Sequence, residues 1–146
     1  IVRKMRIHGM ETMTCDYANG CALYINDAGG NNQPGLWNST SSALIESPNA
    51  SFSASSTLVA GTEGYGIQAT STATGSGGAL GIALRYRQDL LGINGVGGLA
   101  TTTLTIASST SAATSREIVV THKAAVAGET TGGTYDDTLT YSCTAN

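Results

Sequence analysis

The last fifteen residues, 132–146, alternate between two kinds of side chain, and this pattern restricts the possible folds more than any other stretch of the chain. The apolar or aromatic residues recur at odd positions: Tyr135, Leu139, Tyr141, Cys143 and Ala145. Threonine and serine fill most of the even positions. A period of two is typical of a β-strand with one buried and one solvated face. Since such a strand needs a second apolar layer over its buried face, the pattern predicts an antiparallel sandwich.

The composition agrees with a single ordered β-domain. A chain of 146 residues is long enough for one hydrophobic core, and only 12% of its residues are charged, against a usual value of about 25%. Further alternating runs occur at residues 52–60, 65–70, 82–86, 102–108 and 116–123. We therefore predict an all-β fold, a single immunoglobulin-like antiparallel β-sandwich of about eight to nine strands with an N-terminal extended arm. The glycine-rich stretch 92–98 is expected to be a flexible connection.

Residues 1–14 form the predicted arm, and residues 15–146 form the sandwich domain. The apolar side chains that share one face of the arm are Ile1, Met5, Ile7 and Met13. A terminal strand of this length has no hairpin partner before it, so it pairs either within its own domain or with a neighbouring copy. The sequence leaves both alternatives open.

The arm also carries positive charge. Arg3, Lys4 and Arg6 lie among the first ten residues, which contain no acid. Subtracting these three from the seven Lys and Arg residues leaves four cations against ten acids in the rest of the chain. The arm is therefore either a solvated terminus or a segment that meets an acidic surface on a neighbour. An acidic body with a pI near 5.1 argues against nucleic acid as a partner.

Three cysteines, Cys15, Cys21 and Cys143, allow at most one disulfide within the chain. A bridge between Cys15 and Cys21 across the intervening turn is the candidate, with a bridge from either of them to Cys143 as the alternative. The cysteines lack the spacing of a zinc site. One disulfide in a small domain of this composition favours a location outside the cytoplasm. The sequence contains neither a signal-peptide pattern nor an apolar run long enough to cross a bilayer, so we expect the mature form of an exported protein with no membrane span.

No pattern in the chain predicts catalysis or a cofactor. His8 and His122 lie outside any nucleophile motif, and we expect no enzyme activity. Asp136 and Asp137 are neighbours in a strand, so they point to opposite faces and cannot act together as one carboxylate dyad. The glycine runs lack the ending and the following helix of a phosphate-binding loop.

Two surface features remain as candidates for contact or modification. Asn38 and Asn49 each begin an N-glycosylation pattern, which implies exposed loops. The turn-rich loop 27–37 delivers Trp37, and it is the best candidate for a contact-making tip. A single tryptophan beside a loop is more often part of the core than a platform for a ligand.

The second half of the chain resembles a group of secreted β-sandwich proteins of candidate-phyla (Patescibacteria-type) bacteria. The resemblance rests on EGYGIQATS at residues 63–71, on VVTHKAAV at 119–126 and above all on GGTYDDTLTYSCTAN at 132–146. The last motif is also similar to the closing strand of many bacterial immunoglobulin-like surface domains. At the level of the fold, the chain is similar to pilin and matrix-fibre subunits that donate a terminal strand to the next subunit. The resemblance implies no catalytic residues.

These observations lead us to expect a structural subunit of an extracellular filament, pilus or surface layer. Its partners would be other copies of itself, and at most a host or neighbouring cell surface. The arm would add as a strand to the next copy, and main-chain hydrogen bonds would hold it there. We expect the cations of the arm to meet acids of the acceptor, with Asp136, Asp137 and Glu117 as guesses. The alternative is a monomeric cell-surface binding or adhesion module that uses loop 27–37.

Overall fold

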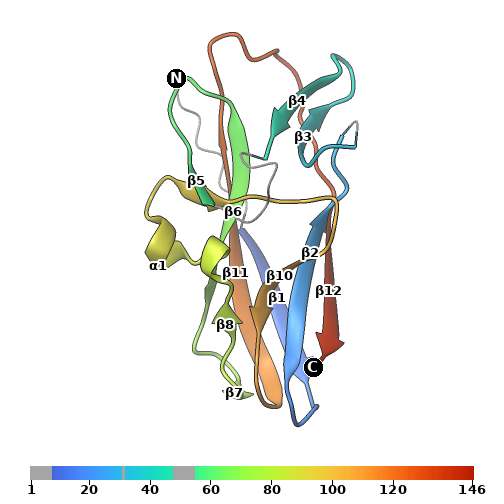
Figure 1. The fold of residues 1–146 in the computed structure, drawn as a ribbon, viewed down its shortest axis with the longest axis vertical. Helices are drawn as coiled ribbons and strands as arrows, with labels where there is room; N and C mark the ends of the chain where they lie inside the picture. The colour runs from blue at the N-terminus through green and yellow to red at the C-terminus, as the bar shows by residue number, and fades with distance from the viewer. Residues whose placement is uncertain (1–7, 31, 48–54) are drawn as a thin grey trace.

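The computed structural model describes residues 8–30, 32–47 and 55–146. The chain is all-β and its strands pair antiparallel in a sandwich, so the predicted fold class is confirmed (Figure 1). The described residues form twelve strands, more than predicted because several are only two or three residues long. The strands are β1 (His8–Cys15), β2 (Cys21–Asp27), β3 (Gly35–Asn38), β4 (Ala43–Glu46), β5 (Ser55–Thr57), β6 (Gly64–Ser71), β7 (Ser76–Gly77), β8 (Gly81–Ile82), β9 (Gly95–Gly97), β10 (Leu104–Ser108), β11 (Ala113–Ala125) and β12 (Leu139–Ala145).

The strands form two larger sheets and one small hairpin. The larger sheet has the order β1-β11-β6-β9-β5, with β7 also paired to β11, and the smaller has the order β12-β2-β10-β8. Strands β3 and β4 form a separate two-stranded sheet. A 3-10 turn, η1 (Leu84–Tyr86), and a one-turn helix, α1 (Gln88–Leu91), precede β9. Strands β1 and β12 lie at the ends of different sheets.

The core lies between the two larger sheets. Ile67 on β6, with Ile118 and Val120 on β11, belongs to the same buried cluster as Ile25 on β2 and Ile106 on β10, and all five are fully buried. Ile118 and Val120 are two residues apart and therefore share one face of β11, as strand geometry requires. Burial of the two facing apolar layers is the main stabilising contribution to a sandwich of this kind.

The structure corrects the prediction for the N-terminal arm. Strand β1 pairs antiparallel with β11 of the same chain, from His8 opposite Thr121 to Cys15 opposite Ala113. Met13 is buried in the core of its own chain. The donor-arm interpretation is therefore wrong from His8 through Met13, because β1 occupies the edge of β11 opposite β6. The other predicted arm contacts, Ile1, Arg3, Lys4, Met5, Arg6 and Ile7, lie outside the described residues.

The structure also replaces two local predictions. Residues 84–86, expected to continue a strand, form η1, and this turn buries Tyr86 while leaving Leu84 exposed. The expected flexible connection contains β9, which lies between β6 and β5 in the larger sheet. A Cβ atom at Gly97 would lie 2.3 Å from the Tyr86 ring, so only glycine allows this close packing.

Candidate functional site

Strand β12 is an open edge of the smaller sheet. It pairs along its whole length with β2, from Leu139 opposite Asp27 to Ala145 opposite Cys21. On its other side, no strand among the described residues pairs with it. An exposed edge strand of this length presents a row of free N–H and C=O groups, which is a template for pairing with another chain.

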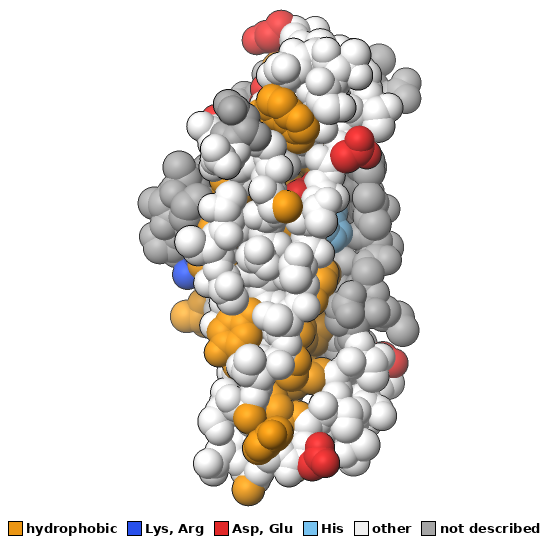
Figure 2. All heavy atoms as spheres, turned by 90° about the vertical axis from the view of Figure 1, so that its right-hand side faces the viewer, with side chains coloured by type: hydrophobic (Ala, Val, Ile, Leu, Met, Phe, Trp, Pro, Cys, Tyr) orange, Lys and Arg blue, Asp and Glu red, His pale blue; other side chains and the backbone are white. Residues whose placement is uncertain are grey.

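The core-facing side of β12 is covered only over its first half. Leu139 and Tyr141 are half-buried and pack against the core. Cys143 and Ala145 fall on the same face by strand alternation, yet both are exposed. Figure 2 looks onto this side of the molecule and shows hydrophobic side chains as a band at the surface. The second half of β12 thus combines free main-chain groups with uncovered apolar side chains.

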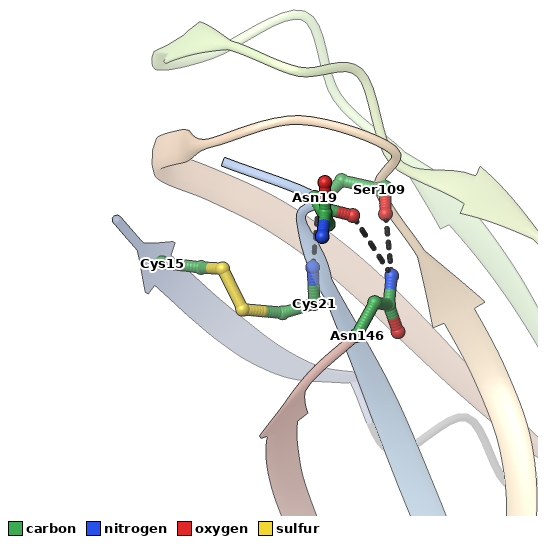
Figure 3. The surroundings of a disulfide bond; sticks show 5 residues. All are labelled: Cys15, Asn19, Cys21, Ser109 and Asn146. Atoms are coloured by element: carbon green, nitrogen blue, oxygen red, sulfur yellow. Dashed lines mark hydrogen bonds between the residues drawn. A yellow bond between two sulfur atoms is a disulfide. The ribbon is translucent and has the colours of Figure 1, made fainter. Parts of the chain in front are cut away.

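The end of the sandwich beside this edge is held together covalently (Figure 3). The predicted disulfide between Cys15 and Cys21 is confirmed, and it joins the end of β1 to the start of β2 and hence the two sheets. The C-terminal Asn146 donates from its side-chain amide to the carbonyl oxygen of Ser109 at 2.8 Å, and from its backbone N–H to that of Gly20 at 3.0 Å. Cys143 is a free thiol on the open edge.

The structure rules out one predicted modification site in the folded protein. The side chain of Asn38 is only 2% exposed. Its Oδ1 atom accepts hydrogen bonds from the backbone N–H groups of Thr40 at 3.1 Å and Ser41 at 3.2 Å. The Asn38 side chain therefore caps a turn and is not free to carry a glycan. The second candidate, Asn49, lies outside the described residues.

The predicted contact loop, 27–37, folds back on itself. Gly30 and Gln33 exchange backbone hydrogen bonds of 2.9 and 3.1 Å. The half-buried ring of Trp37 covers Gly30 so closely that a Cβ atom there would lie 2.3 Å from the ring. Trp37 therefore packs against its own loop, as expected for a tryptophan with a structural role.

The same loop begins at a carboxylate that sequence reasoning did not single out. Asp27, the last residue of β2, is fully buried. Its Oδ1 atom accepts a 2.5 Å hydrogen bond from the backbone N–H of Gly29, whereas Oδ2 has no hydrogen-bond partner among the described residues. Both side-chain oxygens of Asp137 are likewise buried and without a partner there. Burial, and then the neighbouring Asp137, raise the pKa of Asp27 from 3.8 to about 8.

Two more polar groups adjoin this carboxylate pair inside the sandwich. The Tyr65 hydroxyl lies 2.9 Å from Nδ1 of His122, and the two rings stack with their centroids 6.1 Å apart. Burial, and then the charge of Asp137, raise the pKa of the Tyr65 hydroxyl. Burial lowers the pKa of His122, which favours the neutral ring. We call Asp27, Asp137, Tyr65 and His122 the acidic cluster.

A second buried polar group lies on the opposite face of the larger sheet. Lys123 is 6% exposed, and its Nζ atom donates to Oε1 of Gln68 at 2.5 Å and to the carbonyl oxygen of Ile93 at 2.9 Å. Nε2 of Gln68 donates to the carbonyl oxygens of Gly92 and Gly95, each at 2.6 Å. We call Lys123 and Gln68 the basic cluster. It fixes the segment before β9 onto the sheet.

The three acids proposed to meet the arm do not form one surface. Asp137 is wrong as an acceptor for a neighbour's cation, because its carboxylate oxygens are buried. Asp136 exchanges backbone hydrogen bonds with Trp37 at 2.8 and 2.9 Å, and Glu117 lies opposite Thr12 on β1 and accepts a hydrogen bond from Thr72 at 3.2 Å.

Comparison with known proteins found no match: no protein-family model fits the chain, and no curated protein or solved structure is similar to it. Within the part of the chain that the structure describes, no helix is long and apolar enough to cross a membrane. The function must therefore be argued from the two features above, the open edge and the buried polar clusters.

Proposed function

We propose that the chain is a structural subunit of an extracellular filament or surface layer, in which a strand of a neighbouring copy adds to the open edge of β12. The observation that carries the proposal is the exposure of Cys143 and Ala145 on the core-facing side of an unpaired edge. An added strand would satisfy the free main-chain groups of β12. Its side chains would at the same time cover the apolar band (Figure 2).

The donor in this proposal is the segment 1–7 of the next copy. From His8 to Cys15 the chain is paired with its own β11, so the proposed donor is limited to the residues before His8. By sequence, Ile1, Met5 and Ile7 share one face of the donor, and in this proposal that face would cover the exposed side chains of Cys143 and Ala145. The cations of the same segment would approach a body that contains ten acids and only four further cations.

Donor and acceptor are different parts of the chain in this arrangement. A contact between two different surfaces can repeat from copy to copy, and it gives a fibre or a layer where neither a ring nor a reciprocal exchange closes it. The Cys15–Cys21 disulfide supports a location outside the cytoplasm, where such a bond persists. The proposal involves no catalytic step and no cofactor, and its partner is the protein itself.

The test compares the full chain with a variant that lacks residues 1–7. We expect the full chain to form large assemblies in negative-stain microscopy and light scattering, and the truncated variant to remain a folded monomer. A synthetic peptide of residues 1–7 should bind the truncated variant. If the truncated variant assembles as the full chain does, the donor assignment is wrong.

Substitutions on β12 test the acceptor. Cys143→Lys places a charge on the uncovered apolar side and should abolish assembly, whereas Thr144→Lys places it on the opposite face of the same strand and should not. Cys143→Ser distinguishes strand addition from a disulfide between copies, because it should assemble normally. A monomeric full chain that adheres to cells, and loses adhesion when loop 27–37 is replaced, would instead support the binding-module alternative.

A further inference from the structure

The acidic cluster brings together two carboxylates from distant parts of the sequence. Asp27 ends β2, and Asp137 lies two residues before β12, which pairs with β2 in a register that sets Leu139 opposite Asp27. The backbone N–H of Ala28 donates to the carbonyl oxygen of Thr138 at 2.9 Å, which holds the two segments side by side. The position of the pair is thus fixed by the sheet itself.

Three oxygens of this pair have unsatisfied acceptor capacity. Oδ2 of Asp27 and both Oδ atoms of Asp137 are buried and have no hydrogen-bond partner among the described residues. A buried polar atom without a partner carries a large desolvation penalty, and the penalty is greater for an ionised carboxylate. The remaining oxygen, Oδ1 of Asp27, is held by Gly29, and this contact orients the carboxylate. A cation coordinated by several of these oxygens would offset the desolvation penalty.

We propose that Asp27 and Asp137 bind a calcium ion through these three carboxylate oxygens. The Tyr65 side chain lies beside Asp137 and lines the same site. The inference rests on the acidic cluster alone and does not depend on the proposed function.

The donor set favours calcium over other common metals. In the described part of the chain, no group of three or more His, Cys, Asp or Glu side chains could hold a metal ion by itself. Zinc usually takes nitrogen and sulfur ligands from just such groups. Calcium takes oxygen ligands, accepts a carboxylate through both its oxygens, and completes its shell with backbone carbonyls and water. Magnesium demands a stricter octahedral geometry.

A calcium ion here would join two segments that main-chain hydrogen bonds already hold side by side. Asp136 is bonded through its backbone to Trp37 on β3, and Asp27 begins the loop that Trp37 covers. The ion would therefore tie the entry of β12 to β2 and to the loop 27–37. Calcium binding should stabilise the whole sandwich, because an ion that binds the folded state and not the unfolded state shifts the equilibrium toward folding.

The first measurement is a thermal unfolding series. The protein is freed of metal with EDTA, dialysed, and heated with and without about 10 mM CaCl2, a concentration that saturates extracellular calcium sites of ordinary affinity. We expect Tm to rise by about 8 °C with calcium and by much less with the same concentration of MgCl2. No rise with calcium, or an equal rise with magnesium, would overturn the assignment.

Matched variants locate the site. Asp27→Asn and Asp137→Asn keep the side-chain shape, remove the charge, and should abolish the calcium-dependent rise in Tm. Asp136→Asn changes the adjacent exposed residue in the same way and should respond as the unsubstituted protein does. Circular dichroism without calcium checks that each variant is folded. A calcium response that survives in Asp137→Asn would contradict the proposal.

Terbium luminescence reports metal binding directly and does not depend on a change in stability. Tb³⁺ prefers the same oxygen ligands as Ca²⁺, and a nearby tyrosine transfers excitation energy to it. We expect tyrosine-sensitised Tb³⁺ emission that excess CaCl2 quenches by displacement. Tyr65→Phe should lower this emission while a calcium-dependent rise in Tm remains. Emission of equal strength in Asp27→Asn would show that the terbium site lies elsewhere and would overturn the proposal.

Discussion

Strands β6 and β11 contribute Tyr65 and His122 to the acidic cluster on one face and Gln68 and Lys123 to the basic cluster on the other, and the two clusters differ in how their polar groups are hydrogen-bonded. In the basic cluster, the amide of Gln68 makes three hydrogen bonds and Lys123 donates to two oxygens. In the acidic cluster, three carboxylate oxygens have no partner among the described residues. The first cluster satisfies its polar groups with the protein's own atoms, whereas in the second only Oδ1 of Asp27 accepts a backbone hydrogen bond within the described part of the chain, from Gly29.

This difference in hydrogen bonding indicates that the basic cluster has a structural role. A fully bonded network rigidifies what it touches, and the basic cluster fixes residues 92–95 over β6 and β11. A network with orphaned acceptors is destabilising on its own and persists where it has another role. Removing Gln68 should therefore weaken the protein at the basic cluster, whereas removing the charge of Asp27 should strengthen the metal-free protein at the acidic one.

The largest effect is expected at the basic cluster. Gln68→Leu removes the oxygen that accepts from the buried Lys123 and leaves the carbonyls of Gly92 and Gly95 without their donor. We expect the free energy of unfolding to fall by about 3 kcal/mol, because a buried charged group loses a partner. Urea unfolding measures the change, and Gln88→Leu on the exposed helix α1 is the control. A loss below about 1 kcal/mol would mean that the network is not structural.

An effect of opposite sign is expected at the acidic cluster. Burial, and then Asp137, raise the pKa of Asp27 from 3.8 to about 8, so the folded state binds a proton between these values that the unfolded state has released. The stability of the metal-free protein should therefore fall as the pH rises from about 4 to 8, because stability decreases wherever the folded state binds more protons. Unfolding curves in EDTA across this range give the slope, and a rising slope would contradict the assignment.

Asp27→Asn should remove most of this pH dependence. In EDTA at pH 8, we expect the variant to be more stable than the unsubstituted protein by about 2 kcal/mol. Each unit by which the pKa is raised corresponds to about 1.4 kcal/mol of lost stability, which the variant would regain. The buried amide of the asparagine offsets part of this gain, because its own polar atoms also need hydrogen bonds. Near pH 4 the two proteins should differ little. Asp89→Asn, whose carboxylate is exposed and paired with Arg87, serves as the control. Equal stability of Asp27→Asn and the unsubstituted protein at pH 8 would show that the charge is compensated within the fold.

One of the two carboxylates of the acidic cluster, that of Asp137, could have been predicted from the sequence. The period of two in the last strand and the disulfide between Cys15 and Cys21 follow from local patterns, and both are present in the structure. The same period places Asp137 on the apolar face with Leu139, and a carboxylate on that face was the available indication of a buried acid. Its partner, Asp27, is 110 residues away in sequence, and only the pairing of β2 with β12 brings the two together.

Other features could not be predicted because their residues carry no local pattern. Gly95 and Gly97 have no side chains and so show no alternation, yet β9 lies between β6 and β5, with Gly97 close against the Tyr86 ring. The arm had an alternating pattern that suited two partners equally, its own β11 or a neighbour. For the stretch from His8 to Cys15 the observed register is with β11 of the same chain.

The smallest expected effect is that of the Tyr65 hydroxyl, and it tests whether this hydroxyl is coupled to the carboxylates of the acidic cluster. Tyr65→Phe removes the hydroxyl that lies 2.9 Å from His122 and leaves the aromatic ring in the core. We expect a loss of about 1 kcal/mol, the usual contribution of one hydrogen bond between neutral groups. The double variant with Asp27→Asn should show how far the two sites are coupled, since side chains in one network are not additive. If the loss from Tyr65→Phe is the same in both backgrounds, Tyr65 supports His122 alone; if it changes, the hydroxyl also responds to the carboxylates, and the four residues act as one site.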